Sequence, residues 1–166
     1  MIRTVHLPTF QDERGEFRRT FCSSILDASF QRIEQTNVSI NPVINTLRGF
    51  HFEKSFRKES KFMTLLRGAA YFAFVGVDPS HSSYGKIVEF RASASEGKII
   101  IVPPGVANAF LTLTENVIVN YAMTAKYEDC DYGHIFWSEA HLKNIAWPAE
   151  PRLISKKDQQ TTVYFK

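Results

Sequence analysis

The chain has 166 residues, of which 44% are hydrophobic and 22% charged, and this size and composition are typical of one soluble globular domain covering residues 1–166. The formal net charge of +3, with acidic and basic residues mixed along the chain, lacks the basic stripe expected of a nucleic-acid-binding protein. No apolar run approaches the roughly 20 residues of a membrane span, and the first residues lack the apolar core of a secretory signal. Cys22 and Cys130 have neither a metal-ligand spacing nor a disulfide framework, so we expect free thiols and a cytoplasmic location.

Short apolar segments of strand length follow one another from residue 31 to residue 123. Residues 86–92 alternate with period two, and residues 98–102 form a continuous apolar run that stops at a Pro-Pro-Gly turn. Turn signals recur about every 8 to 12 residues, which is typical of an all-β sandwich or barrel. Strands are predicted at residues 31–40, 46–53, 60–67, 69–77, 86–92, 98–102, 108–113 and 116–123.

Helical signals are few. Residues 22–30 and 138–144 are the two candidates for short helices, the second with Ser138 as its N-cap. Fourteen Phe and six Tyr suit the half-buried, pleated surfaces of a β-rich core. We therefore expect an all-β fold with a few short helices, built as a jelly roll of two facing sheets whose mouth gathers inward-pointing side chains into one pocket.

The predicted strand at residues 46–53 carries a histidine and an arginine. Strict alternation places Arg48 on one face of this strand and His51 on the other. A β-bulge at Gly49 would rotate part of this set and change which side chains share a face.

The turn at residues 103–105 resembles the turn that precedes the second motif of cupins. Metal-binding cupins carry two histidines and a glutamate in their first motif and a histidine after this turn. Here the first motif offers only His51, and Asn108 occupies the position after the turn. Because a divalent metal needs about three or four protein ligands, the sequence predicts no metal site.

Ordered motifs extend over almost the whole chain. They are residues 10–17, 35–39, 47–52, Lys61, residues 83–86, residues 103–107, Tyr121, residues 147–148 and residues 153–158. In sequence and spacing they resemble the motifs of the dTDP-4-dehydrorhamnose 3,5-epimerase family. The resemblance implies a cupin jelly roll (a double-stranded β-helix), a homodimer, and a reaction that uses neither a metal nor an organic cofactor.

The resemblance also implies a reaction: inversion of carbon 3, carbon 5 or both in a nucleoside-diphosphate-linked 4-keto-6-deoxy sugar or 4-keto heptose, for surface polysaccharide synthesis. A proton beside a ketone is acidic because the resulting carbanion spreads onto oxygen. One group removes it, another returns a proton to the opposite face, and a donor stabilises the enolate oxygen. By resemblance the base is His51, the acid is Tyr121 and the enolate donor is Lys61. Asp158 lies in the charged run at residues 156–158, which we expect to be exposed, and by the resemblance it would fix the tautomer of His51.

Other residues are assigned to the substrate by the same resemblance. Arg48 and Arg14 would hold the diphosphate, and Phe17 and Tyr127 would pack on the nucleoside. The remaining substrate-binding candidates are Arg19, Gln35, Asn37 and Asn108. The other histidines, which we assign to structure or solvent because they lack any partner pattern, are His6, His81, His134 and His141.

Two residues depart from the family pattern. Asn108 stands where the family carries a histidine, and an amide cannot exchange a proton near neutral pH. Arg19 stands where the family has a glutamate that contacts thymine; a guanidinium can only donate, as it does to the O6 and N7 edge of guanine. This favours a GDP-linked sugar over a dTDP-linked one, and some relatives act on GDP-linked 4-keto heptoses in capsule synthesis.

Two other functions remain compatible with the sequence. A 4-keto sugar 3,4-ketoisomerase would share the scaffold and the enolate chemistry, although such enzymes tend to work with histidines on one side. A non-catalytic nucleotide-sugar-binding cupin would not need the full set of His51, Tyr121 and Lys61. The set therefore favours the epimerase.

Overall fold

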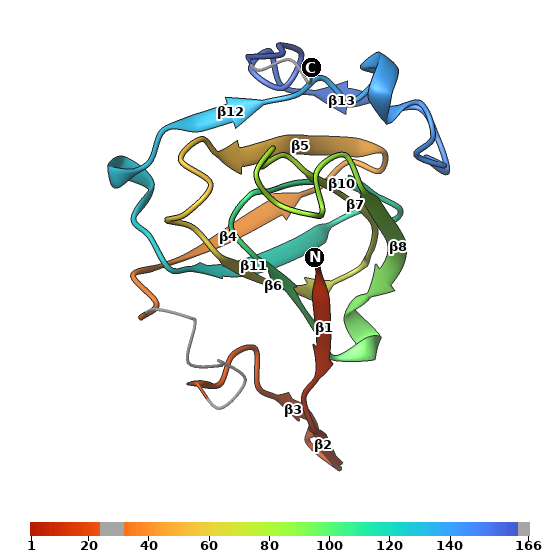
Figure 1. The fold of residues 1–166 in the computed structure, drawn as a ribbon. Coiled ribbons are helices and arrows are strands. Elements are labelled where there is room, and N and C mark those ends of the chain that lie inside the picture. The colour runs from red at the N-terminus through yellow and green to blue at the C-terminus, as the bar shows by residue number, and fades with distance from the viewer. Residues whose placement is uncertain (24–31, 163–166) are drawn as a thin grey trace.

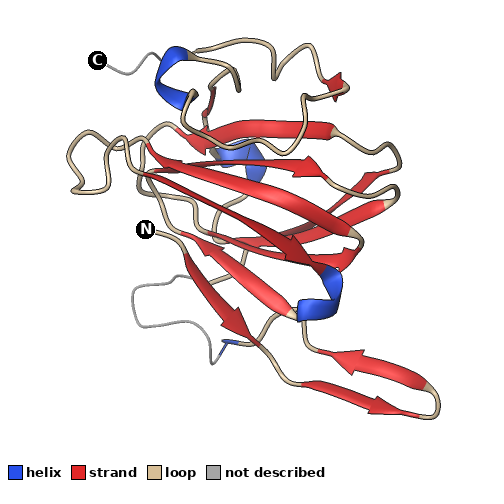
Figure 2. Ribbon diagram, turned by 90° about the vertical axis from the view of Figure 1, so that its right-hand side faces the viewer, coloured by secondary structure: helices blue, strands red, loops and turns tan. Residues whose placement is uncertain are grey.

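The computed structural model describes residues 1–23 and 32–162, and in them two sheets of mainly antiparallel strands lie face to face (Figures 1 and 2). The first sheet has the order β1-β9-β6-β11-β4, with β1 (Arg3–His6), β9 (Lys98–Val102), β6 (Lys61–Arg67), β11 (Val117–Met123) and β4 (Gln35–Asn41). The second has the order β12-β5-β10-β7-β8, with β12 (Tyr132–His134), β5 (Thr46–Glu53), β10 (Val106–Thr112), β7 (Ala69–Gly76) and β8 (Ile87–Ser93). β13 (Leu153–Ile154) pairs in parallel with β5. The expected all-β jelly roll is confirmed.

Apolar clusters cover both faces of the second sheet, which explains why its central strands read as unbroken apolar runs. Along β7, Phe72 and Phe74 belong to the cluster between the two sheets, and Tyr71, Ala73 and Val75 belong to a cluster on the other face. This division follows the alternation of side chains along a strand. The chain after β12 covers the outer cluster with Ile135, Leu142, Ile145 and Trp147. Strands buried on both faces need no polar alternation.

A hairpin near the N-terminus projects away from the two-sheet body (Figure 2). It consists of β2 (Thr9–Asp12) and β3 (Gly15–Arg18), which pair with each other. Its aromatic side chains Phe10 and Phe17 are 57% and 67% exposed. The hairpin thus presents apolar surface to solvent.

The helical expectations meet different outcomes. The predicted helix at residues 138–144 is wrong: the segment contains only a 3-10 turn, η4 (Ala140–Leu142), and its N-cap is Glu139, without a side-chain capping bond, rather than Ser138. Only Leu142 of this segment is buried, so it has no apolar stripe with which to stabilise a longer helix. The predicted helix at residues 22–30 lies mostly outside the described residues. Two further 3-10 turns in the described residues are η2 (Ala94–Glu96) and η3 (Tyr127–Asp129). Nowhere in the described part of the chain is there a helix with the length and hydrophobicity for a membrane crossing.

Candidate active site

A cavity of about 460 Å³ is lined by side chains from both sheets. His51 and Arg48 reach it from β5 in the second sheet, whereas Tyr121 on β11 and Lys61 on β6 reach it from the first. An adjoining cavity of about 80 Å³ shares these four residues. The larger cavity is also lined by Gln35, Asn37, Met123, Tyr127, Glu128, Tyr132, His134, Ser155, Lys157 and Asp158, and the smaller one by Ser39, Met63, Asn108 and Phe110. One hollow therefore has an imidazole and a phenol on walls from different sheets.

A bulge in β5 allows both Arg48 and His51 to line this hollow. His51 is opposite Asn108 on β10, and Arg48 is opposite Phe110, so three steps along β5 match two along β10. Gly49, inside the bulge, has φ of +109°, and a Cβ added there would lie 2.4 Å from the carbonyl oxygen of Asn108. Only glycine fits such a position. The expectation that a bulge at Gly49 rotates the strand is confirmed.

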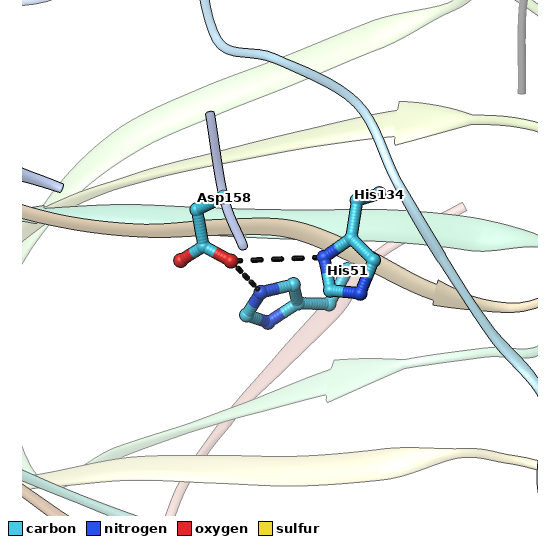
Figure 3. Close-up of side chains that lie close together, drawn as sticks. All are labelled: His51, His134 and Asp158. Atoms are coloured by element: carbon cyan, nitrogen blue, oxygen red, sulfur yellow. Dashed lines mark hydrogen bonds and ion pairs between the residues drawn. The ribbon is translucent and has the colours of Figure 1, made fainter. Parts of the chain in front are cut away.

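Asp158 and His51 form a hydrogen-bonded pair. His51 Nε2 lies 2.7 Å from Asp158 Oδ1, and the Gly49 amide donates to Asp158 Oδ2 at 3.3 Å (Figure 3). Because an ionised carboxylate only accepts, Nε2 of His51 carries the hydrogen and its Nδ1, which faces away from Asp158, has the free lone pair. Burial raises the pKa of Asp158, but the His51 contact and the Gly49 amide outweigh it and hold the pKa below its ordinary value.

The expectation that Asp158 is exposed is wrong, because its residue is only 5% exposed. The backbone amide of Asp158 donates to Ser155 Oγ at 3.1 Å, and this turn points the carboxylate inward. The charged neighbours Lys156 and Lys157 were the reason for expecting an exposed segment. In a turn, however, adjacent side chains point in different directions, so Asp158 can be buried beside exposed lysines.

His134 is a site residue that the sequence did not reveal. It stands opposite His51 in the β12–β5 pair, its ring centroid is 5.0 Å from that of His51, and its Nδ1 is 3.6 Å from Asp158 Oδ1 (Figure 3). The sequence assigned it to structure or solvent; the structure excludes solvent, because the residue is buried beside the pair and lines the cavity. Burial, with the nearby His51 and Lys157, lowers the pKa of His134 to about 4.

Tyr121 lies across the hollow on β11, between Asn37 on β4 and Met63 on β6. Burial raises the pKa of its phenol above the ordinary value, and the charge of Arg48 offsets this only in part. The phenol is thus protonated at neutral pH and is available as a proton donor.

Lys61 is buried and held by two acceptors. Its Nζ donates to Asn108 Oδ1 at 3.1 Å and lies 2.9 Å from Glu59 Oε1. Tyr132 donates to the other oxygen of Glu59, and burial, with Glu59, raises the pKa of that phenol. A buried ammonium needs such compensation. Glu59 and Tyr132 were not predicted, since nothing in their local sequence marks them as inward-facing.

The other rim contacts join β4, η3 and the C-terminal segment. Gln35 donates to Asn37 and accepts from the backbone amide of Tyr127 at 2.8 Å, and Lys157 Nζ lies 3.3 Å from Tyr127 Oη. The Tyr127 ring stacks on Tyr132 at 4.8 Å. This rim therefore combines two stacked tyrosine rings with the Lys157 ammonium and the Glu128 carboxylate.

Three predicted substrate residues do not meet the cavity of their own chain. Arg14 and Phe17 lie on the projecting hairpin, and Arg19 follows it. All three are exposed, and Arg14 is paired with Asp12. Their assignment to the substrate stays a prediction.

His51, His134 and Asp158 are close enough to be considered as metal ligands. Two ligands of a tetrahedral zinc ion, each about 2.0–2.1 Å from it, stand about 3.3 Å apart. The 2.7 Å contact between His51 and Asp158 is shorter than this. The distance between His51 and Asp158 therefore fits a hydrogen bond better than joint coordination of a metal ion.

The fold and the site define a cupin-type protein with ionisable side chains on opposite walls of one cavity. The family model described as dTDP-4-dehydrorhamnose 3,5-epimerase matches residues 2–164. The chain therefore belongs to the dTDP-4-dehydrorhamnose 3,5-epimerase family and is an enzyme of the isomerase class, so the resemblance is confirmed.

Individual relatives agree with this membership. The chain is 30% identical to dTDP-4-dehydrorhamnose 3,5-epimerase of Methanothermobacter thermautotrophicus, over 90% of this chain and 82% of the relative. It is also 30% identical to the Escherichia coli K12 protein of the same name, over 91% and 83%. The crystal structure of the Bacillus anthracis dTDP-4-dehydrorhamnose 3,5-epimerase with TDP and PPi bound superposes with a TM-score of 0.89 at 26% identity, covering 98% of this chain and 94% of that one.

Proposed function

We propose that this chain inverts carbon 3, carbon 5 or both of a nucleoside-diphosphate-linked 4-keto-6-deoxy sugar. The observation that carries the proposal is that His51 and Tyr121 line one hollow from different sheets. The cavity of about 460 Å³ lies within the usual range for small-molecule sites. Membership of an epimerase family supports the same reaction.

His51 begins the reaction as the base. Its Nδ1 lone pair takes the proton from the carbon beside the ketone, and the ring becomes an imidazolium whose Nε2–H is held by Asp158. The nearby carboxylate stabilises the positive charge that develops on the ring. The C–H electron pair moves into the enolate, leaving negative charge on the former ketone oxygen.

Lys61 and Tyr121 complete the reaction. The Lys61 ammonium, fixed by Glu59 and Asn108, is the donor for the enolate oxygen. Tyr121 then gives its phenolic proton to the carbon from the opposite face, which inverts the centre. Each turnover leaves an imidazolium and a phenolate, and proton exchange with water restores both.

Charged and aromatic groups at the rim suit the nucleoside diphosphate. Arg48 and Lys157 line the cavity and supply positive charge, and Tyr127 offers a ring for stacking. The TDP-bound Bacillus anthracis relative supports thymidine as the nucleoside. Arg19 is the residue that favours guanosine as a second candidate.

We further propose that the enzyme is a cytoplasmic homodimer and acts in surface polysaccharide synthesis. These statements extend the family resemblance. They do not affect the chemistry assigned to the cavity.

The test is incubation in deuterated water with dTDP- and GDP-linked 4-keto-6-deoxy sugars and a GDP-linked 4-keto heptose, with NMR used to locate deuterium and follow inversion. We expect deuterium at each inverted carbon. The His51→Asn variant should lose exchange by about 10²- to 10⁴-fold, the usual contribution of a general base. The Tyr121→Phe variant should keep exchange from the His51 face but lose inversion.

His6→Asn is the matched control, because His6 is exposed and outside the cavity. Migration of the carbonyl from carbon 4 to carbon 3 would instead identify a ketoisomerase. Tight binding without exchange would identify a binding protein. Unchanged exchange in His51→Asn would refute the role of His51, and retained inversion in Tyr121→Phe would refute the role of Tyr121.

A further inference from the structure

His134 is a second histidine beside the pair formed by His51 and Asp158. It is the residue opposite His51 in the antiparallel β12–β5 pair, and directly opposed residues project from the same face of a sheet. The two rings consequently meet edge to face at 80°, with centroids 5.0 Å apart. Figure 3 shows both rings directed at one carboxylate oxygen.

The ring of His134 is buried but has no hydrogen bond among the described residues. The residue is 5% exposed, and both Nδ1 and Nε2 are inaccessible and unpaired. Its Nδ1 lies 3.6 Å from Asp158 Oδ1, which already accepts from His51 at 2.7 Å. An ionised carboxylate can only accept, so the favourable tautomer carries its hydrogen on Nδ1.

A space-filling role alone does not account for an imidazole here. Burying two unpaired ring nitrogens carries a desolvation penalty that a phenyl ring of similar shape would avoid. The benefit that offsets this penalty must come from the polar ring itself, and Asp158 is the group that it faces.

We propose that His134 is a positioning residue for the catalytic base. As a neutral imidazole, it points its Nδ1–H at Asp158, and this N–H dipole partly offsets the negative potential that the carboxylate exerts on the His51 ring. His134 thereby lowers the basicity of His51. The inference rests on the proposed function only in calling His51 the catalytic base; the electrostatic coupling stands without it.

The surroundings keep His134 neutral. Burial, with His51 and Lys157 nearby, disfavours its protonated form and outweighs the attraction of Asp158. Other ionisable groups face the same cavity from β5, β6, β11, β12 and η3, namely Arg48, Lys61, Tyr121, Tyr132, Tyr127 and Glu128. They are common to every variant considered below, so differences between variants report on position 134.

The test is an NMR titration of the His51 ring in the intact protein without substrate. His134→Phe keeps the ring volume and removes the donor, so the full Asp158 charge acts on His51, and the His51 pKa should rise by about half a unit or more. His134→Asn places an amide nitrogen near the former Nδ1 and should leave the His51 pKa within about 0.2 units of the wild-type value. His6→Asn is the control.

An unchanged His51 pKa in His134→Phe, or an equal rise in His134→Asn, would overturn the proposal. The wild-type protein offers a second measurement if a variant does not fold: nitrogen shifts should show His134 neutral with the hydrogen on Nδ1 between about pH 5 and 8. Hydrogen on Nε2 in that range would overturn the proposal equally. Because neither measurement uses substrate, failure of the epimerase assignment in the deuterium experiment is a separate result.

Discussion

Buried ionisable side chains lie at the cavity on both sheets, and most of them have partners. Asp158 accepts from His51 and from the Gly49 amide, and Lys61 is held by Glu59. Each of these charges retains hydrogen bonds that replace those lost to water. His134 differs, because its ring has no hydrogen bond to any residue that the structure describes and stays neutral. It therefore makes the folded protein sensitive to acid.

The sign of this effect follows from the two pKa values of His134. The pKa is about 4 in the folded protein and about 6.5 in an unfolded chain, so between these values the unfolded state binds more protons. Acid therefore favours unfolding, and His134 should remove about 2 kcal/mol of stability between pH 7 and pH 5. Urea unfolding should show a correspondingly smaller loss in His134→Asn. Equal losses in the variant and the wild-type protein would contradict this.

The sequence, read through its family resemblance, anticipated the residues that meet in the cavity through long strands. His51, Tyr121 and Lys61 lie on strands that periodicity and motif order had already located. His134, Glu59 and Tyr132 were missed because their placement depends on pairing with distant residues. β12 has only three residues, which are too few to show a periodic pattern, so its register against β5 could not be predicted from the sequence.

At the scale of the element, the bulge in β5 is the feature that builds the site. It turns Arg48 and His51 into the same hollow and directs the Gly49 amide at Asp158. Most of the strands were predictable: β5 and β9 have the predicted bounds, and β6, β7, β8, β10 and β11 differ by one or two residues. The strand expected at residues 31–40 is β4, which spans Gln35–Asn41. β1, β2, β3, β12 and β13 were not expected, because they are short or lie outside the apolar core.

Gly49→Ala should damage both stability and activity. The added methyl group would meet the backbone of Asn108 and Ala109 within 2.8 Å, and the positive φ adds strain. We expect a loss of about 2 to 5 kcal/mol in the free energy of unfolding, measured with urea. Deuterium exchange should fall as well, because His51 would be displaced.

Gly85→Ala is the matched control for this substitution. Gly85 also has positive φ, at +69°, but a Cβ there would have no heavy atom within 4 Å. Its cost should be limited to about 1 kcal/mol of backbone strain, with exchange unchanged. Similar losses in the two variants would show that close packing at Gly49 is unimportant.

At the scale of the whole molecule, the hairpin of β2 and β3 extends away from the body with Phe10 and Phe17 exposed. A two-stranded hairpin is at best marginally stable alone in water. Exposed apolar groups of this kind indicate a contact surface. In the homodimer that the resemblance implies, the second subunit would cover these side chains.

The same arrangement leads to a prediction about Arg14 and Phe17. If they bind the nucleotide, they must do so in the cavity of a second copy, because they do not line their own. We therefore expect the double variant Arg14→Ala, Phe17→Ala to be nearly inactive, and the His51→Asn variant likewise. A mixed dimer of the two would combine an intact hairpin from one protomer with an intact base in its partner.

Mixing the two inactive variants under conditions that exchange protomers should therefore restore activity. Random exchange makes half of the dimers mixed, and each mixed dimer has one complete site, so recovery should reach about a quarter of the wild-type rate. Light scattering would establish that dimers form, and each variant alone under the same conditions is the control. If the hairpin served its own cavity, every site in the mixture would lack either the base or the hairpin residues, and no activity would return.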